Sequence, residues 1–439
     1  MTSIERSYRT SLPPLLLLAL AMFVVGTNAF VIAGLLPDIA GDLGVSPTEV
    51  SYSITSYAIV VAVVSPLVSI VLARVPRPVL MAAGLAVFAL GTAVAAASDS
   101  VGWFIAGRTL SGLGGAALVP TATASAALLA RPERRGQALA LVGAGFTLAT
   151  AVGSPFGTAF GGAAGWRTPM WILVGIAAVL IVLIPLVVRG VPVSAPVSLR
   201  RRLAPLAEPR ILALLATTFL MIAGFNVVYI FSSAVTAEAT GGSGALLAVL
   251  LLSYGAAGVI GNLVAGPATD RLGSRLTAIV ALGGQVAALG VLTFVESSFV
   301  ASIVVFAVWG VAAFAIAIPV QHRLVSVDPE SAALTLGWYS TAMYVGIAVA
   351  PPLGTAALSL GGPIALPIAG AVVTALALAF FLTASTRRRR AAASAAVPAP
   401  AAAPASASAP ADVPEPTPAP ADVPEPTPAP ADISACMPR

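Results

Sequence analysis

The stretch LLLLALAMFVVGTNAFVIAGLL, residues 15–36, runs for 22 residues without a charged side chain. About 20 apolar residues in a helix are enough to cross the hydrocarbon core of a bilayer. Because the stretch is continuously apolar rather than alternating, it predicts a helix and not a strand of a membrane barrel. It starts too late, runs too long and lacks a convincing cleavage site for a signal peptide, so we expect it to be a true span.

Eleven more stretches of this kind follow. The twelve predicted spans cover residues 12–36, 50–73, 78–97, 101–129, 137–163, 167–188, 211–236, 244–268, 275–295, 298–320, 331–358 and 363–385. The composition agrees, since 58% of the residues are hydrophobic and 9% are charged, whereas soluble domains have about 25% charged residues. The predicted fold class is an all-α membrane protein with twelve transmembrane helices.

The polar residues exclude several other classes of protein. The 22 basic residues are all arginines and are too dispersed to line a groove for nucleic acid, so we expect no nucleic-acid partner. One cysteine, Cys436, and one histidine, His322, argue against disulfides, a Cys/His metal site and a Cys–His nucleophile. We therefore expect neither an enzyme nor a bound cofactor. The absence of lysine favours a GC-rich coding sequence and a bacterial source.

The placement of the arginines predicts the orientation. With the N-terminus in the cytoplasm, 20 of the 22 arginines fall in inner segments, while Arg167 lies outside and Arg108 lies within a span. The outer loops carry acidic residues, namely Asp38, Asp42, Glu49, Asp99, Glu238 and Glu296. This is the positive-inside bias. It predicts a multi-pass protein of the plasma membrane, the inner or cell membrane of a bacterium, with both termini cytoplasmic.

Two copies of a six-span unit make up the predicted membrane region. Pro155-Phe156-Gly157-Thr158-Ala159 recurs 197 residues later as Pro352-Leu353-Gly354-Thr355-Ala356, and Pro132-Glu133 and Arg74 recur at the same offset. We expect a cytoplasmic N-terminus (1–10), a first six-helix bundle (11–188), a central cytoplasmic loop (189–210), a second bundle (211–386) and a tail (387–439). The tail is rich in alanine and proline and is predicted to be disordered.

Four motifs carry a family resemblance. They are Gly26-Thr27-Asn28-Ala29-Phe30 continuing to Ala40, Arg108 to Ala116, Gly153-Ser154-Pro155-Phe156-Gly157, and Gly266 to Arg275. Their order and spacing resemble the major facilitator superfamily, and within it the twelve-span drug:proton antiporters that include chloramphenicol and arabinose exporters. The structural residues of these motifs are Gly112, Gly115, Gly153, Pro155, Gly157, Gly266, Asp270, Arg271, Gly273 and Arg275. The resemblance implies two pseudo-symmetric bundles with a substrate cavity between them.

The chain departs from the family pattern at two alanines. The stretch from Gly266 to Arg275 resembles a loop motif that the family also has in its first half, between the second and third helices. In that first-half copy, Ala73 stands where the motif has its aspartate, so a charge-relay latch is doubtful there, whereas Asp270 keeps one possible in the second half. Ala29 stands where many members of the group carry an acid just before the phenylalanine of the first motif. The obvious proton carrier within the membrane is therefore missing.

The coupling residues are expected to be Arg108 and Asp38. Arg108 lies ~12 Å deep in its span, where a charge is costly unless it faces a polar cavity or a partner. Arg108 either lines the route that couples transport to protons, or it is a structural arginine that bonds the carbonyls at a helix end. Asp38 is an outer-end acid that Pro37 would turn toward the cavity, and ordinary helix-end solvation is the alternative.

Six uncharged polar residues are candidates for the substrate cavity. They are Asn28, Tyr57, Asn226, Gln285, Tyr339 and Tyr344. An isolated amide in hydrocarbon is costly, so each asparagine should face the cavity or bond another helix, and both readings stay open.

Two functions fit the sequence. The first is export of small neutral or amphiphilic compounds, such as chloramphenicol, by proton antiport with alternating access. The second is transport of a sugar, nucleoside or amino acid on the same fold. The expected partners are a small-molecule substrate, protons and the lipid bilayer, and we expect a monomer.

Topology reporters test the orientation. Because of the arginine bias, fusions at residues 99, 240 and 296 should report an external location, and a fusion at residue 205 a cytoplasmic one. A cytoplasmic signal at residue 240 would overturn the assignment.

Overall fold

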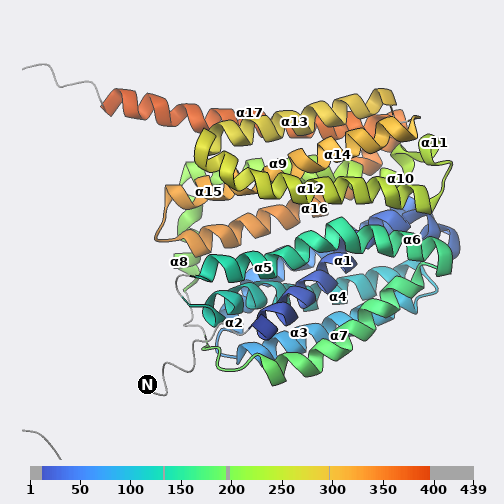
Figure 1. The fold of residues 1–439 in the computed structure, drawn as a ribbon, viewed down its shortest axis with the longest axis horizontal. Helices are drawn as coiled ribbons and strands as arrows, with labels where there is room; N and C mark the ends of the chain where they lie inside the picture. Colours follow the sequence, from blue (N-terminus) through green and yellow to red (C-terminus); the bar gives the residue numbers. More distant parts are fainter. Residues whose placement is uncertain (1–11, 132–133, 194–197, 296, 396–439) are drawn as a thin grey trace, which may run out of the picture. The chain divides into compact units, whose positions relative to one another are not determined.

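The computed structural model describes residues 12–131, 134–193, 198–295 and 297–395, and these residues form helices and turns without a strand (Figure 1). The expected cytoplasmic N-terminus (1–10), Pro132-Glu133 and the tail from residue 396 lie outside the described residues. Within the described part, twelve helices are long and apolar enough to cross a bilayer. The predicted all-α membrane fold with twelve spans is confirmed.

The spans follow the predicted order. In the first half they are α1 (Leu12–Leu43), α2 (Pro47–Val71), α3 (Arg77–Ala96), α4 (Val101–Leu129), α5 (Arg135–Leu148) continued by α6 (Ser154–Ala164), and α7 (Arg167–Val187). In the second half they are α9 (Pro209–Ile230), α12 (Gly244–Leu272), α13 (Ser274–Val295), α14 (Phe299–Ala315) continued by α15 (Ala317–Val327), α16 (Ala332–Gly361) and α17 (Ala365–Ala395). Short helical turns α8 (Leu199–Leu203), η4 (Ala204–Ala207), α10 (Ser232–Val235) and α11 (Ala237–Thr240) lie in the connections.

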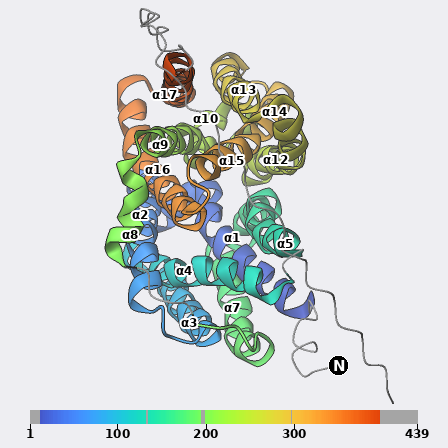
Figure 2. The ribbon, with the colours of Figure 1, turned by 90° about the vertical axis from the view of Figure 1, so that its left-hand side faces the viewer.

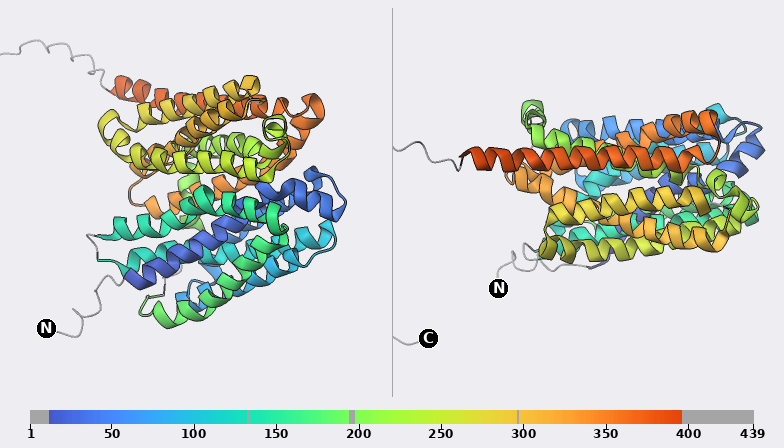
Figure 3. Two further views of the ribbon diagram at one scale, coloured as in Figure 1. Left: turned by 45° about the vertical axis from the view of Figure 1, so that its right-hand side comes forward. Right: turned by 90° about the horizontal axis from the view of Figure 1, so that it is seen from above.

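The two halves lie side by side. In Figure 1 the helices α1–α7 occupy the lower part and α9–α17 the upper part, and the end-on view of Figure 2 shows the same division. Helix α2 packs on α16, and α12 packs on α6, so each half contributes to the contact. The long final helix α17 lies at the edge of the second half (Figure 3).

The apolar residues are arranged for a lipid environment. Large side chains on the outer faces of the helices are exposed, for example Leu360 at 88% and Phe294 at 85%. An exposed apolar surface of this extent is unfavourable in water but favourable against lipid tails. Inside, one apolar cluster includes Leu35 and Ile230, so it joins residues of both halves.

Local signals explain where helices begin and end. At the start of α2, the Ser46 side chain accepts a hydrogen bond from the backbone N–H of Glu49 at 3.2 Å, and the Ser46 N–H donates to the Glu49 carboxylate at 2.8 Å. This capping box satisfies two backbone donors that the helix leaves free. Helix α12 ends at Gly273, whose φ of 82° lies in the left-handed region that favours glycine.

The fifth span contains a π-helical turn, η3 (Ala149–Gly153), between α5 and α6. Pro155 follows directly, in the first turn of α6. Proline has no N–H and its ring crowds the carbonyl four residues earlier, which here belongs to Ala151 of the π-helical turn. The fifth span thus accommodates Pro155 next to a widened turn.

The last helix differs from the expected boundary at residue 386. Helix α17 continues through residues 387–390 and ends at Ala395, whereas these residues were expected to begin a disordered tail. Arginine and alanine are both strong helix formers, and nothing between residues 387 and 395 breaks a helix. The proline-rich composition that predicts disorder begins only after this point.

Two glycines of α5 provide a matched test of the packing. A Cβ added at Gly145 would collide with the backbone carbonyl of Ala19 in α1, while one at Gly143 would meet nothing within 4 Å. We expect Gly145→Ala to destabilise the protein by about 1–3 kcal/mol because α1 must shift. Gly143→Ala should be neutral or slightly stabilising. Thermal unfolding of the purified variants measures both, and equal stability would contradict the packing of α5 on α1.

Candidate functional site

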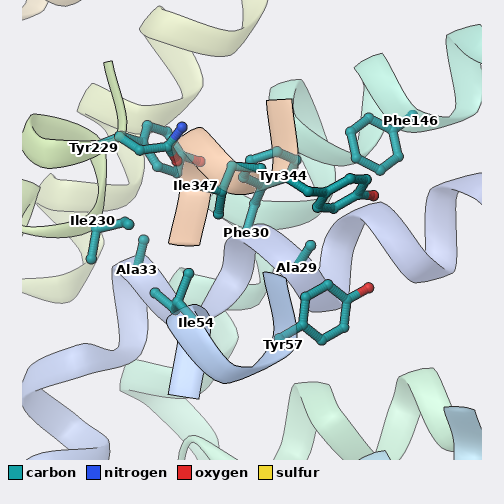
Figure 4. A pocket seen from close by; sticks show the side chains of 11 residues that line it. Ala29, Phe30, Ala33, Ile54, Tyr57, Phe146, Tyr229, Ile230, Tyr344 and Ile347 are labelled. Atoms are coloured by element: carbon teal, nitrogen blue, oxygen red, sulfur yellow. The ribbon is translucent and has the colours of Figure 1, made fainter. Parts of the chain in front are cut away.

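A narrow pocket lies between the two halves (Figure 4). Its walls come from α1, α2 and α5 of the first half and from α9 and α16 of the second. The lining residues are Ala29, Phe30, Ala33, Ile54, Tyr57, Phe146, Asn226, Tyr229, Ile230, Tyr344 and Ile347. Because both halves contribute, any relative movement of the halves changes the shape of this pocket.

Aromatic rings dominate the lining. Phe30 makes edge-to-face contacts with Phe146, at 5.6 Å between ring centroids, and with Tyr229, at 5.9 Å. Tyr229 in turn packs against Phe225 and Tyr254 in the second half. Such geometry favours planar, apolar ligand groups, which bind to aromatic faces and edges. The polar groups of the lining are the Asn226 amide and the tyrosine hydroxyls.

Three of the six residues predicted for the cavity lie in this pocket, namely Tyr57, Asn226 and Tyr344. The Asn226 side-chain N–H donates to the carbonyl of Ile222, four residues earlier in the same helix, at 2.9 Å. Its amide is therefore partly satisfied within α9. Figure 4 shows the Tyr57 and Tyr344 side chains at the pocket, one from each half.

The other three candidates lie elsewhere. Gln285 donates to the Thr374 hydroxyl at 2.9 Å and to the Met221 carbonyl at 3.3 Å, so it joins three helices of the second half. Tyr339 is buried in an apolar cluster of that half. Asn28 is buried within the first half, where it bonds Arg108 and another helix. For Asn28 and Gln285 the structure therefore gives interhelical bonding.

Arg108 is fully buried in α4. Its Nη1 donates to the backbone carbonyl of Asn28 at 3.0 Å and to the side-chain carbonyl of the same residue. Its guanidinium carbon also lies 4.7 Å from the centroid of the Tyr57 ring, which gives a cation–π contact. The charge is thus held between α1 and α2 by neutral groups.

A third helix fixes the orientation of the Asn28 amide. The Thr92 hydroxyl donates to the Phe88 carbonyl at 2.8 Å, so it accepts from the Asn28 side-chain N–H at 2.7 Å. The amide nitrogen therefore faces Thr92 in α3, and the amide oxygen faces Arg108. Asn28, Thr92 and Arg108 together connect α1, α3 and α4.

Asp38 is exposed near the C-terminal end of α1, ten residues from Asn28. At 1.5 Å per residue this separation is about 15 Å along the helix. Pro37 lies within α1, and the helix continues past it to Leu43. Asp38 is not among the hydrogen-bond and ring contacts of Arg108 described above.

The motif glycines of the first half lie at close helix contacts. A Cβ at Gly112 would lie 2.9 Å from the Tyr57 backbone carbonyl, and one at Gly115 would lie 2.9 Å from the Tyr57 hydroxyl. Added Cβ atoms at Gly153 and Gly157 would collide with Thr27 and Val31 of α1. These glycines therefore let α4 approach α2 and let the fifth span approach α1.

The second-half loop motif is more open. A Cβ at Gly266 would meet nothing within 4 Å, and Asp270 and Arg271 are exposed at the end of α12. Arg275 is half-buried in the first turn of α13. In the described part of the chain, the ion pairs found do not include Asp270 with either arginine.

Trp166 and Arg167 make polar contacts near the C-terminal end of α1. Arg167 pairs with Asp42 at 2.5 Å and with Asp99 at 3.7 Å, and its Nη2 donates to the Ser98 carbonyl at 2.9 Å. Trp166 donates to the same Asp42 carboxylate at 3.2 Å. Trp166 and Arg167 thus connect α1, α7 and the α3–α4 turn.

Sequence reasoning missed most of the pocket wall. Phe30 belongs to a motif singled out in the sequence, and Tyr229 follows Asn226 by three residues on the same helical face. That spacing is the signal by which Tyr229 could have been found. Thr92 has no comparable signal, because it lies in an apolar span and acts through a residue of another helix.

The fold defines a class, a multi-pass membrane transporter with two halves of six spans each and a pocket between them. The sequence profile of the Major Facilitator Superfamily matches residues 18–326 and 213–420. The chain belongs to this superfamily and is a transporter, not an enzyme.

Several curated proteins are similar over most of their length. A chloramphenicol resistance protein of Streptomyces lividans is 30% identical over 361 residues, which cover 79% of this chain and 89% of that protein. The uncharacterised MFS-type transporter YbcL of Bacillus subtilis is 29% identical over 338 residues, which cover 77% of this chain and 87% of that protein. The inner membrane transport protein YdhP of Escherichia coli K12 is 29% identical over 366 residues, which cover 83% of this chain and 94% of that protein.

A hydrogen-bond chain between the halves provides the next test. The Tyr229 hydroxyl donates to Ser154 at 3.1 Å, and the Ser154 hydroxyl donates to the Phe30 carbonyl at 3.2 Å. In a double-mutant cycle of Tyr229→Phe and Ser154→Ala, we expect a coupling energy of about 0.5–1.5 kcal/mol in thermal unfolding. Additive effects of the two substitutions would show that this bond does not join the halves.

Proposed function

We propose that the protein exports small neutral or amphiphilic organic compounds by proton antiport with alternating access. It would act as a monomer in a bacterial plasma membrane, with both termini cytoplasmic. The observation that carries the substrate class is the pocket lining, which combines aromatic and aliphatic side chains with one amide and a few hydroxyls. Such a site binds apolar or amphiphilic ligands and orients them by a few polar contacts.

The competing substrate class is a sugar, nucleoside or amino acid. These molecules carry many hydrogen-bonding groups, and each group that loses water without a partner costs free energy. The lining supplies too few donors and acceptors to replace that water. The similarity to a protein named for chloramphenicol resistance also supports export of an amphiphile.

The contacts between the halves support alternating access. The Tyr229–Ser154 bond and the bond from the Thr55 hydroxyl to the Ala348 carbonyl, at 2.9 Å, lie toward the proposed outer ends of their helices. These hydrogen bonds and the apolar cluster that joins the halves would separate when the halves rock against each other. We assign this structure to a state in which the outer side is closed.

In this proposal Arg108 and Asp38 couple transport to protons. A guanidinium stays charged over the useful pH range, so Arg108 does not carry the proton itself. Its charge can hold a carboxylate ionised when the two approach, and can release that carboxylate when the conformation changes. Asp38 is the acid we assign to this role.

A drug-susceptibility panel on an efflux-deficient host tests the function. Expression should protect against several neutral amphiphilic antibiotics, chloramphenicol among them. Arg108→Ala should abolish protection at unchanged membrane abundance, and Asp38→Asn should slow transport and alter its pH dependence. Asp99→Asn is the matched control, since Asp99 is an outer acid that is 98% exposed, and it should leave transport unchanged. A change in metabolite release without protection would favour the competing substrate class.

Inverted membrane vesicles test the coupling separately. Substrate added to energised vesicles should release protons in the wild type and not in Arg108→Ala. Downhill substrate flux without proton release would contradict antiport and make the protein a facilitator.

A further inference from the structure

The Arg108 guanidinium carries a charge that its protein contacts leave uncompensated. The side chain is fully buried, and none of the ion pairs formed by the described residues includes it. Its hydrogen-bond acceptors are the two carbonyl groups of Asn28, which are neutral. A buried cation with neutral partners alone is unfavourable compared with one that meets an anion.

The unused donors of Arg108 have a defined geometry. Both Asn28 carbonyls bond Nη1, whereas Nε and Nη2 are buried and have no hydrogen-bond partner among the described residues. The Nε–H and one Nη2–H form the side-on fork of a guanidinium, in which the two donors point in parallel. This fork matches the two oxygens of one carboxylate, and it can also hold a single halide ion.

The guanidinium lies next to the wall of the pocket. The guanidinium makes a cation–π contact with the Tyr57 ring, and Tyr57 lines the pocket. Asn28 is followed by Ala29, which also lines the pocket and is only half-buried. Ala29 has only a methyl side chain. Tyr57 and the Asn28–Ala29 segment of α1 therefore connect the guanidinium to the wall of the pocket.

We propose that Arg108 is an anion-binding site that takes one singly charged group from the pocket on its Nε and Nη2 donors. The group is the carboxylate of an amphiphilic organic compound or a small inorganic anion such as chloride. None of the ion pairs of the described residues includes Arg108, so the countercharge is brought by the ligand instead of by the chain. This site goes beyond the proposed function, because it depends neither on the direction of transport nor on protons.

Ligand-dependent thermal unfolding of the full chain in lipid nanodiscs tests the site. The buffer contains sodium gluconate, a heavily hydroxylated anion that suits the apolar pocket poorly, and ionic strength is kept constant. Benzoate should raise Tm saturably, and benzamide, its neutral analogue of the same shape, should bind roughly tenfold or more weaker. Chloride is titrated in parallel.

Benzoate and chloride distinguish an organic carboxylate from an inorganic anion as the ligand of Arg108. A saturable rise with benzoate alone supports an organic carboxylate, and a rise with chloride that competes with benzoate supports a site for inorganic anions as well. No saturable rise with either anion, or equal responses to benzoate and benzamide, would overturn the proposal.

A matched pair of variants at residue 29 tests whether a negative charge is what Arg108 binds. Ala29→Glu supplies an internal carboxylate beside Asn28, and Ala29→Gln supplies a neutral side chain of the same size. In gluconate, Ala29→Glu should have the higher Tm, and its benzoate affinity should be roughly tenfold or more weaker than that of Ala29→Gln. Equal benzoate responses in the two variants, or equal stability in gluconate, would overturn the proposal. Transport is not measured, so failure of the export function would leave these results unaffected.

Discussion

The burial of one guanidinium is the constraint on which the first half of the molecule depends. Arg108 lies in an apolar bundle, where its charge must be stabilised by whatever the neighbouring helices provide. Asn28 supplies two carbonyls and Tyr57 supplies a ring face, and Thr92 orients the Asn28 amide. Four helices, α1 to α4, therefore have to meet at this point, and the glycines of α4 allow them to approach closely enough.

The pocket follows from the same arrangement. Asn28 bonds Arg108, while its neighbours Ala29 and Phe30 line the pocket. Phe30 then continues into the aromatic cluster of the second half through Tyr229. One short segment of α1 thus contacts the buried charge through Asn28 and lines the pocket through Ala29 and Phe30. A ligand that enters the pocket can therefore act on the charged cluster and on the contact between the halves.

The sequence predicted the spans well because twenty-residue apolar stretches have few alternatives in a bilayer. The ends of two spans differ from the prediction. Helix α1 continues through Pro37 to Leu43, because a transmembrane helix tolerates proline, and α17 continues to Ala395. The sequence could indicate that Asn28 and Gln285 need partners, but not which ones. Those partners, Arg108 and Thr374, lie 80 and 89 residues away, so they depend on how the helices pack.

The central claim, that Arg108 is a buried charge held by neutral groups, is tested most directly by Asn28→Asp. This substitution puts a carboxylate where the amide oxygen now bonds Nη1. Thermal unfolding is measured for Asn28→Asp in the wild-type background and in an Arg108→Gln background. A charged, uncompensated Arg108 predicts that Asn28→Asp raises Tm in the first background and lowers it in the second. An equal loss of stability in both backgrounds would contradict the claim.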